Sequence, residues 1–312
     1  MPNAGNLGEN LNRPSETERI TRTDSTPGID SEFSDGVNWG GSSGSCIMTL
    51  TKDNATGWAV VTGAASGLGL AIAKELRSDY DLLLIDSNTS GLAKASHRIE
   101  VVTGDVSDAE TWVRARACLD GAVPQWLVQC AGIAVSGSIA EAPIEHWRKA
   151  LDVNLLGMVL GCRTFVPDMA QAGEGHIIHI ASRAAITAVP RFGPYAASKA
   201  AVVAMTETLH NEIGDRLTVT VACPSYFRSN LVDRMVSQDE VERRALARMI
   251  SGSPRSAEDL AVSIPRAARR GDLYFFPPGE DRHLWRLKRL MPLRTLRLVR
   301  DKFRTALRQL EK

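Results

Sequence analysis

The feature that most constrains the fold of this chain is a glycine-rich segment between an apolar run and a helical pattern. Residues 58–62 read WAVVT, residues 63–69 read GAASGLG, and residues 70–76 have helical spacing. Glycine lets a backbone turn tightly and approach a phosphate, whose charge is met by the amides that open the following helix. The pattern predicts a strand–turn–helix unit suited to a dinucleotide. The same glycines also occur in tight turns that bind no ligand.

Apolar and β-branched runs divide the middle of the chain at regular intervals. Several of them are apolar without alternation, as in parallel strands that are covered on both faces, and most intervals can hold a helix. This predicts a single α/β domain with a doubly wound parallel sheet of about seven strands and helices on both faces. The runs cover residues 58–62, 82–86, 99–103, 126–130, 176–181, 217–222 and 272–276.

Charge separates this middle from two tails. Residues 1–47 carry seven acidic and three basic side chains among many Gly, Ser, Asn and Thr residues, which predicts a disordered and dispensable N-terminal extension. Residues 282–312 carry eleven basic and two acidic side chains. Residues 48–281 are therefore the candidate folded domain, with a basic extension after it.

The basic extension, residues 282–312, has apolar residues at helical intervals on both sides of Pro292. We expect an amphipathic helical extension whose apolar stripe docks on the domain or on a second subunit. The alternative is contact with an anionic membrane, with its Leu, Trp and Phe side chains in the interface. Nucleic-acid binding is not expected, because no recognition fold accompanies the charge. The stripe comprises Leu284, Leu287, Met291, Leu296, Val299, Phe303, Leu307 and Leu310.

Asp86 ends the second apolar run, about twenty residues after the glycines. An acid at this place can accept hydrogen bonds from the hydroxyls of an adenosine ribose, and it repels a 2′-phosphate. No Arg or Lys occurs between Gly63 and Gly69 or directly after Asp86. The sequence therefore favours NAD over NADP. A solvated carboxylate at a strand end is the alternative reading.

A second set of polar residues follows the fifth run. Ser182 ends this run, Tyr195 comes thirteen residues later, and Lys199 follows Tyr195 by four, so that Tyr195 and Lys199 share a helix face. An ammonium beside a phenol stabilises the tyrosinate, which predicts a lowered pKa for Tyr195 and a usable general acid or base. Ser182 can hold a substrate oxygen beside that phenol. Taken singly, each residue can equally be structural.

Together these residues closely resemble the short-chain dehydrogenase/reductase family in its short single-domain form. The resemblance covers about residues 56–265 and implies a Rossmann-type fold and NAD(P)-dependent oxidation or reduction. The residues that carry it are Thr62, Gly63, Gly67, Gly69, Asp105, Val106, Ala131, Gly132, Asn154, Ser182, Tyr195, Lys199 and Pro224.

The resemblance implies a role for each matching position. In the catalytic set, Tyr195 exchanges a proton with the substrate oxygen, which Ser182 orients. Lys199 binds the nicotinamide ribose and tunes Tyr195, and Asn154 holds a water that links Lys199 to solvent. Hydride passes directly between substrate and nicotinamide, so no metal is implied.

The implied cofactor contacts run along the ends of the strands. Residues of the glycine turn line the pyrophosphate, Asp86 meets the ribose, and Asp105 with Val106 meets the adenine. Ser229 stands where the family has Thr and offers its hydroxyl to the carboxamide. The implied contacts are Gly63, Ser66, Gly67, Leu68, Gly69, Asp86, Asp105, Val106, Ala131, Gly132, Tyr195, Lys199, Pro224 and Ser229.

Two departures from the family pattern concern stability and the loop over the nicotinamide. Gln129 and Cys130 replace the usual Asn-Asn before Ala-Gly, so different side chains must brace the central strand. Ser225 replaces the glycine of the usual Pro-Gly, and a positive φ at that position is costly for serine.

The substrate expected from the sequence is a hydrophobic, lipid-like or steroid-like alcohol or ketone. The residues expected around it are small, aliphatic or aromatic, which also fits ordinary packing of a loop on the domain. These residues are Ile133, Ala134, Ala184, Ala185, Val189, Tyr226, Phe227, Leu231, Val232, Met235 and Val236.

The predicted function is that of an NAD-dependent oxidoreductase that interconverts a secondary alcohol and a ketone, with Tyr195 as acid/base. One alternative is an NADPH-dependent 3-oxoacyl thioester reductase, and another is a catalytically weak dinucleotide-binding scaffold. We expect a cytoplasmic homodimer or homotetramer that can also contact a membrane peripherally. The five scattered cysteines suggest neither a disulfide framework nor a zinc site. No run reaches the roughly 18 uninterrupted apolar residues of a membrane-spanning helix.

Overall fold

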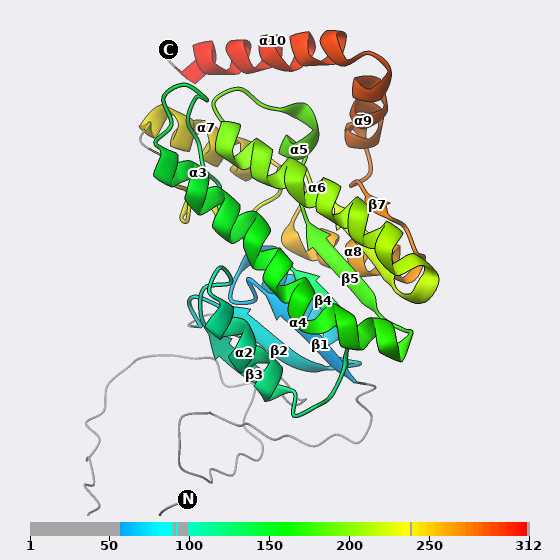
Figure 1. The fold of residues 1–312 in the computed structure, drawn as a ribbon. Coiled ribbons are helices and arrows are strands. Elements are labelled where there is room, and N and C mark those ends of the chain that lie inside the picture. Colours follow the sequence, from blue (N-terminus) through cyan, green and yellow to red (C-terminus); the bar gives the residue numbers. More distant parts are fainter. Residues whose placement is uncertain (1–56, 90–91, 93–98, 238, 311–312) are drawn as a thin grey trace, which may run out of the picture. The chain divides into compact units, whose positions relative to one another are not determined.

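The computed structural model describes residues 57–89, 92, 99–237 and 239–310 (Figure 1). The predicted N-terminal extension, residues 1–47, lies outside the described residues. Its disorder and the boundaries of the folded domain therefore stay predictions.

A seven-stranded parallel sheet forms the centre of the described chain, in the order β3-β2-β1-β4-β5-β6-β7. The predicted fold class, a doubly wound Rossmann-type sheet, is confirmed. In the register of the sheet, Thr62 pairs with both Ile85 and Gln129, so three central strands end at one edge. The strands are β1 Trp58–Thr62, β2 Asp81–Asp86, β3 Ile99–Thr103, β4 Pro124–Gln129, β5 His176–Ile180, β6 Thr218–Ala222 and β7 Tyr274–Phe275.

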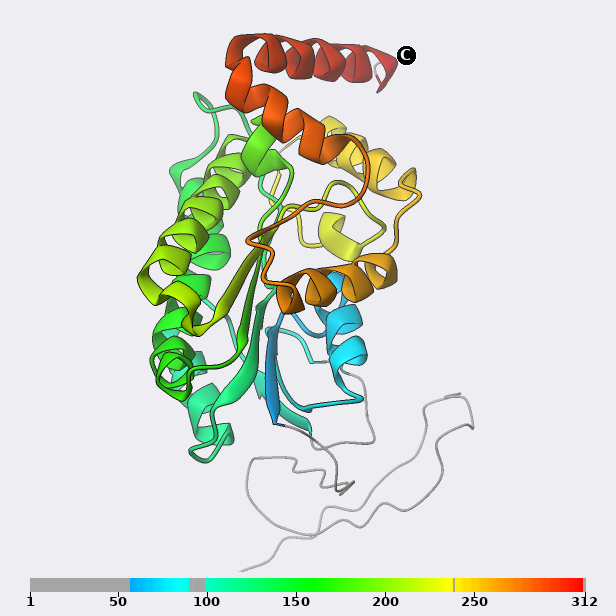
Figure 2. The same ribbon diagram turned by 90° about the vertical axis from the view of Figure 1, so that its right-hand side faces the viewer.

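Helices cover both faces of the sheet (Figure 2). On one face, Ile72 of α1 (Gly67–Leu76) and Ile264 of α8 (Ala257–Arg269) are fully buried against the strands. On the other face, Trp112 of α2 (Ala109–Cys118) and Phe165 of α4 (Gly157–Ala172) pack edge to face. Each face thus has its own apolar core, which explains the apolar runs of the sequence.

The remaining helices lie toward the ends of the strands and after them. They are α3 Ile144–Leu151, α5 Ala184–Thr187, α6 Gly193–Ile213 and α7 Glu240–Ser251, followed by α9 Glu280–Leu290 and α10 Pro292–Leu310, with single turns at Gly214–Arg216 and Asn230–Val232.

A π-helical turn, Asp152–Leu156, joins α3 to α4 in one continuous helical run. Such turns occur often at functional sites, because they redirect side chains within a helix. The run Ile144–Ala172 is long and apolar enough to cross a membrane by length and composition alone. Phe165 and Met169 of this run are fully buried in the core, which is also what a core helix presents.

The C-terminal helices pack against the domain. Trp285 of α9 lies 5.1 Å from Tyr274 and 5.4 Å from Phe276 between ring centroids. Helix α10 contacts α5 and α7, and its Phe303 is buried. The structure therefore agrees with the docking expectation for part of the stripe, because Trp285 and Phe303 pack on the domain and are not available to a membrane interface.

Candidate active site

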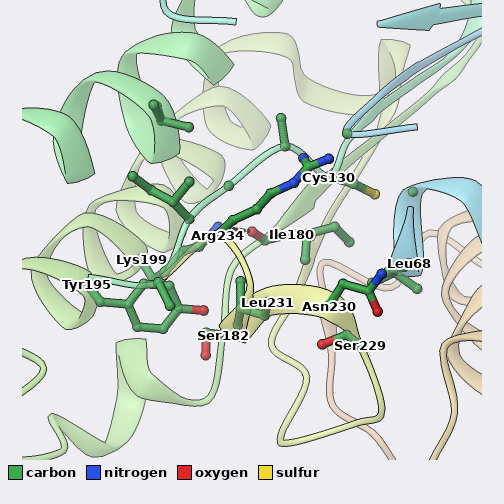
Figure 3. Close-up of a pocket in the computed structure, with 18 of the residues that line it drawn as sticks. Leu68, Cys130, Ile180, Ser182, Tyr195, Lys199, Ser229, Asn230, Leu231 and Arg234 are labelled. Atoms are coloured by element: carbon green, nitrogen blue, oxygen red, sulfur yellow. Dashed lines mark hydrogen bonds between the residues drawn. The ribbon is translucent and has the colours of Figure 1, made fainter. Parts of the chain in front are cut away.

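A cavity of about 470 Å³ opens where the central strands end (Figure 3). It collects residues from strand ends, the glycine turn, α6 and the loop after β6. The predicted residues that line it are Gly63, Ser66, Gly67, Leu68, Gly69, Asp86, Asp105, Val106, Ala131, Gly132, Ser182, Tyr195, Lys199, Pro224 and Ser229. Asn154 is the one predicted site residue that does not line the cavity.

The glycine turn leaves the start of α1 open to the cavity. No side chain caps this end and its first turn carries no acid, so its first amides are free to meet an anion. Gly63 has φ +65°, and a Cβ there would lie 2.9 Å from the Cα of Ala131. A Cβ on Gly67 would lie 3.9 Å from Cβ of Ser229, which belongs to the opposite wall. The turn therefore fits a dinucleotide pyrophosphate.

Asp86 is almost fully buried at the end of β2. Its Oδ2 accepts a hydrogen bond from the amide of Ala65 (3.0 Å) and its Oδ1 accepts one from the amide of Asn88 (3.0 Å). Its Oδ1 also lies 3.4 Å from Nη1 of Arg234, which belongs to the loop between β6 and α7. No Arg or Lys follows Asp86 directly in the sequence, but folding brings in an arginine 148 residues away.

Asp105 lines the part of the cavity that the family resemblance assigns to the adenine. It accepts hydrogen bonds from the amide and hydroxyl of Ser107 and from Lys149, whose Nζ lies 3.2 Å away. Burial raises its pKa, but these hydrogen bonds outweigh burial and hold the pKa of Asp105 below its usual value. Lys149 was not predicted, since nothing in its local sequence connects it to Asp105.

Ser182, Tyr195 and Lys199 converge at the other end of the cavity (Figure 3). Ser182 follows β5, and the other two lie one turn apart on α6. Burial raises the pKa of Tyr195, while a hydrogen bond with Ser182 acts in the opposite direction. The Lys199 ammonium donates to the carbonyl of Ile180 (2.8 Å), and burial lowers its pKa to about 8. The predicted lowering of the Tyr195 pKa is therefore wrong for this structure.

Asn154 lies behind this end of the cavity, fully buried in the π-helical turn. Its Oδ1 accepts from the amide of Ile133 (2.8 Å), and its Nδ2 donates to the carbonyl of Ile133 and the hydroxyl of Ser198. A Cβ on Gly132 would lie 3.0 Å from Asn154 Oδ1 and 3.1 Å from Lys199 Nζ. Asn154 thus holds the segment after β4 beside Lys199, and a Cβ at position 132 would require these side chains to shift by a few tenths of an ångström.

Both departures from the family pattern have a structural outcome. Gln129 is buried, and its Nε2 donates to the carbonyl of Met158 (3.1 Å), so it ties β4 to α4. Burial raises the pKa of Cys130 to about 12, which keeps this thiol neutral. Ser225 is not among the residues with positive φ. The expected backbone strain at Ser225 is therefore wrong.

The substrate end of the cavity is mostly apolar, as predicted from part of its lining. Arg191 fixes α7 over this end through ion pairs with Asp239 and Glu242. The predicted residues that line the cavity are Ile133, Ala134, Ala184, Val189, Tyr226, Phe227 and Leu231. The predicted residues Ala185, Val232, Met235 and Val236 do not line it. The sequence did not reveal several further apolar residues of the lining, among them Phe192, Leu246 and Ile250.

His179 of β5 is a core residue. His179 is fully buried, its Nδ1 lies 2.9 Å from Thr206 Oγ1, and burial lowers its pKa to about 3. No group of three His, Cys, Asp or Glu side chains suited to a metal occurs among the residues that the structure describes.

A carboxylate at the ribose end, an open helix start and a Ser–Tyr–Lys set in one cavity define a dinucleotide-dependent oxidoreductase site. The family model for the short-chain dehydrogenases matches residues 57–240. The chain belongs to the short-chain dehydrogenase/reductase family, and it is an NAD(P)-dependent enzyme of the kind that acts on CH–OH groups.

This chain is similar to dehydrogenases that are named for different substrates. The chain is 30% identical over 239 residues to 2-(R)-hydroxypropyl-CoM dehydrogenase of Xanthobacter autotrophicus, with 72% of this chain and 91% of the relative covered. It is 34% identical over 254 residues to 11-beta-hydroxysteroid dehydrogenase-like 6 of Arabidopsis thaliana, with 75% and 73% covered. A short-chain dehydrogenase/reductase from Burkholderia phymatum in complex with NAD superposes with a TM-score of 0.70 at 26% identity, covering 80% and 97% of the two chains.

Proposed function

We propose that the protein is an NAD-dependent oxidoreductase that interconverts a secondary alcohol and a ketone on an apolar small molecule. The observation that carries the proposal is one cavity with two different ends. Asp86 and the open start of α1 lie at one end, and Ser182, Tyr195 and Lys199 lie beside an apolar wall at the other.

The residues of this chain divide the work of the reaction. A bound nicotinamide dinucleotide supplies the hydride acceptor in oxidation and the donor in reduction. Ser182 orients the substrate oxygen, and the Tyr195 hydroxyl takes or gives the proton at that oxygen. Lys199 places a cation behind the phenol and binds the nicotinamide ribose. Asn154 positions Lys199 through the strand end that both residues contact.

Cofactor preference follows from the charges at the ribose end. The buried Asp86 carboxylate supports NAD, since it accepts hydrogen bonds from ribose hydroxyls and repels a 2′-phosphate. Arg234 moderates this preference, because its guanidinium lies on the same carboxylate oxygen and attracts a phosphate. We therefore expect NAD to bind more tightly than NADP, by a smaller margin than an unpaired Asp86 would give.

The apolar wall supports an apolar substrate. Ala134, Leu246 and Ile250 belong to one buried cluster around the loop after β6, and Phe192 and Leu231 pack against it. Such a wall offers few hydrogen bonds to a sugar but buries a hydrocarbon skeleton. This supports a lipid-like or steroid-like alcohol or ketone.

Replacement of Tyr195 by phenylalanine tests the reaction and the acid/base assignment together. The substitution removes the transferable proton and keeps the ring, so we expect NAD-linked turnover to fall by about 10²- to 10⁴-fold. The assay measures NADH formation on a panel of apolar secondary alcohols. Tyr226→Phe, in the same cavity, is the matched control and should retain turnover. Equal activity of wild type and Tyr195→Phe would exclude the proposed role.

Assembly and location are also proposals. We propose a homodimer or homotetramer, supported by Leu156 at the end of the π-helical turn, which is 47% exposed although apolar. We propose a cytoplasmic location, supported by the five cysteines of the sequence, whose scattered positions suggest no disulfide framework. Light scattering of the purified chain tests the first proposal, and fractionation of cells that express it tests the second.

A further inference from the structure

The bend between α9 and α10 exposes apolar side chains at an unusual density. Leu290 and Leu293 are 80% and 70% exposed, and three further large apolar residues of this bend exceed one third. Ten exposed large apolar residues occur among the described ranges, and five of them fall within positions 290–298. Scattered exposed leucines need no explanation, whereas a cluster indicates an interaction surface. We call these five residues the apolar bend: Leu290, Met291, Leu293, Leu296 and Leu298.

The outer face of α10 is basic. Leu293, Arg297, Arg300, Arg304 and Arg308 follow each other at intervals of three or four, so they share one helix face, and all are exposed. We call the four arginines the arginine row. The residues of the opposite face, Thr295, Val299, Phe303 and Ala306, are buried or half-buried.

The face of α10 that packs on the domain determines which face of the helix is exposed to solvent. Because α10 contacts α5 and α7, the apolar half of the helix is occupied by the domain and the arginine row points away from it. Among the described residues of α10, the acidic side chain is that of Asp301, and it forms an ion pair with the adjacent Arg300 (3.1 Å). The remaining charge is available to an anionic partner.

We infer that the apolar bend and the arginine row form a binding surface for anionic lipid membranes. Arginines near a negatively charged lipid surface gain electrostatic energy, and protruding leucines enter the boundary between headgroups and acyl chains. An acidic protein would satisfy the arginines but leave Leu290 and Leu293 in water unless it also offered an apolar surface. A second copy of this chain, face to face, would oppose one arginine row to another.

This surface differs from the membrane contact that the sequence suggested. The stripe that includes Phe303 faces the domain, and contact depends on the outer arginines and the protruding leucines. Helix α10 contacts α5 and α7, and Ala184, Leu246 and Ile250 of these helices line the cavity. The surface would therefore hold the wall of the substrate chamber beside the lipid.

Vesicle co-sedimentation of the full-length chain tests the charge requirement. The vesicles consist of phosphatidylcholine alone or of phosphatidylcholine mixed with phosphatidylserine. We expect binding to the mixed vesicles, and a decrease of about a hundredfold in partitioning for the triple variant Arg297→Gln, Arg304→Gln and Arg308→Gln, because each basic residue contributes about fivefold. The matched control, Lys74→Gln, Arg148→Gln and Arg163→Gln, removes three exposed cations from other helices and should keep most of the binding.

A second pair of variants tests the apolar bend. Leu290→Ser with Leu293→Ser should weaken vesicle binding, whereas Val113→Ser with Ile139→Ser removes two apolar side chains elsewhere that are 61% and 77% exposed and should not. Absence of wild-type binding to anionic vesicles would overturn the inference, as would equal losses in the variants and their controls. A smaller oligomer in the leucine variant would instead identify a self-association surface, and binding of polyglutamate that ignores the leucine changes would identify an acidic-protein surface. None of these readouts depends on turnover.

Discussion

Replacement of Arg234 by glutamine should shift the chain toward NAD. The substitution removes the cation from Asp86 Oδ1, frees that oxygen for a ribose hydroxyl, and takes away the positive charge that can meet a 2′-phosphate. Asp86 remains buried with its two backbone hydrogen bonds. We therefore expect the ratio of the NADP dissociation constant to the NAD dissociation constant to rise.

The size of the shift follows from the geometry of the ion pair. Nη1 and Oδ1 are 3.4 Å apart, and two unit charges near 4 Å interact by about 1 kcal/mol in water and about 4 kcal/mol at an effective dielectric constant near 20. The Arg234 side chain is 38% exposed, so solvent screening brings the value toward the lower limit. An interaction of about 1–2 kcal/mol corresponds to a change of about 5- to 30-fold in the ratio.

Isothermal titration calorimetry of both dinucleotides measures this ratio without a substrate. Wild type, Arg234→Gln, Asp86→Asn and the double variant form a cycle, in which Asp86→Asn should improve NADP binding more when Arg234 is present. Arg244→Gln is the control, since Arg244 is exposed on α7 and lies outside the cavity. If Arg234→Gln altered both dissociation constants by the same factor, Arg234 would have no part in cofactor selectivity.

Three further predictions concern the buried residues of the site and core. Gly132→Ala places a Cβ about 3 Å from Asn154 Oδ1 and Lys199 Nζ, which should displace Lys199 from its place behind Tyr195. We expect kcat to fall by about 10²-fold while the melting temperature changes little. An unchanged kcat would contradict this displacement. Burial lowers the Lys199 pKa to about 8, so the side chain loses its positive charge as the pH rises through that value. We therefore expect kcat/KM for ketone reduction to decline above pH 8. A kcat/KM that stays constant up to about pH 10 would show that the positive charge of Lys199 is not needed. His179 has a pKa of about 3 when folded and 6.5 in its ordinary state, so the unfolded chain binds the extra proton and stability falls as the pH drops below 6.5. Denaturant unfolding should show a loss of about 2 kcal/mol near pH 5 that is reduced in His179→Gln, and an identical pH dependence in both proteins would refute this.

Local patterns in the sequence were sufficient to predict the sheet and the shared cavity. The apolar runs match the strands because parallel strands must be apolar on both faces, a property that is visible in each run separately. The edge strand β7 is shorter than its run, Tyr274–Phe275 against residues 272–276, since an edge strand has one partner to define its ends. Tyr195 and Lys199 could be placed together because a helix fixes the distance between positions four apart.

Contacts between distant segments could not be predicted in this way. Arg234 meets Asp86, and Arg191 meets Glu242, through loops whose course no periodicity specifies. The pKa of Tyr195 depends on burial, which is a property of the assembled cavity and not of the spacing to Lys199. The docking of α10 remained open because one apolar stripe suits a domain, a subunit or a membrane equally well.

The position of α7 divides the chain into two functional stretches. The family match ends at residue 240, where α7 begins, yet Leu246 and Ile250 of α7 line the cavity. The residues proposed for proton transfer and dinucleotide binding thus precede this point, as do most residues of the cavity wall, while Leu246 and Ile250 add a part of the wall from beyond it. Under the proposed function, substitutions at Leu246 and Ile250 should change which alcohol is accepted while the chemistry stays the same. For the design of new substrate scope, α7 and the α10 helix that supports it are the segments to vary.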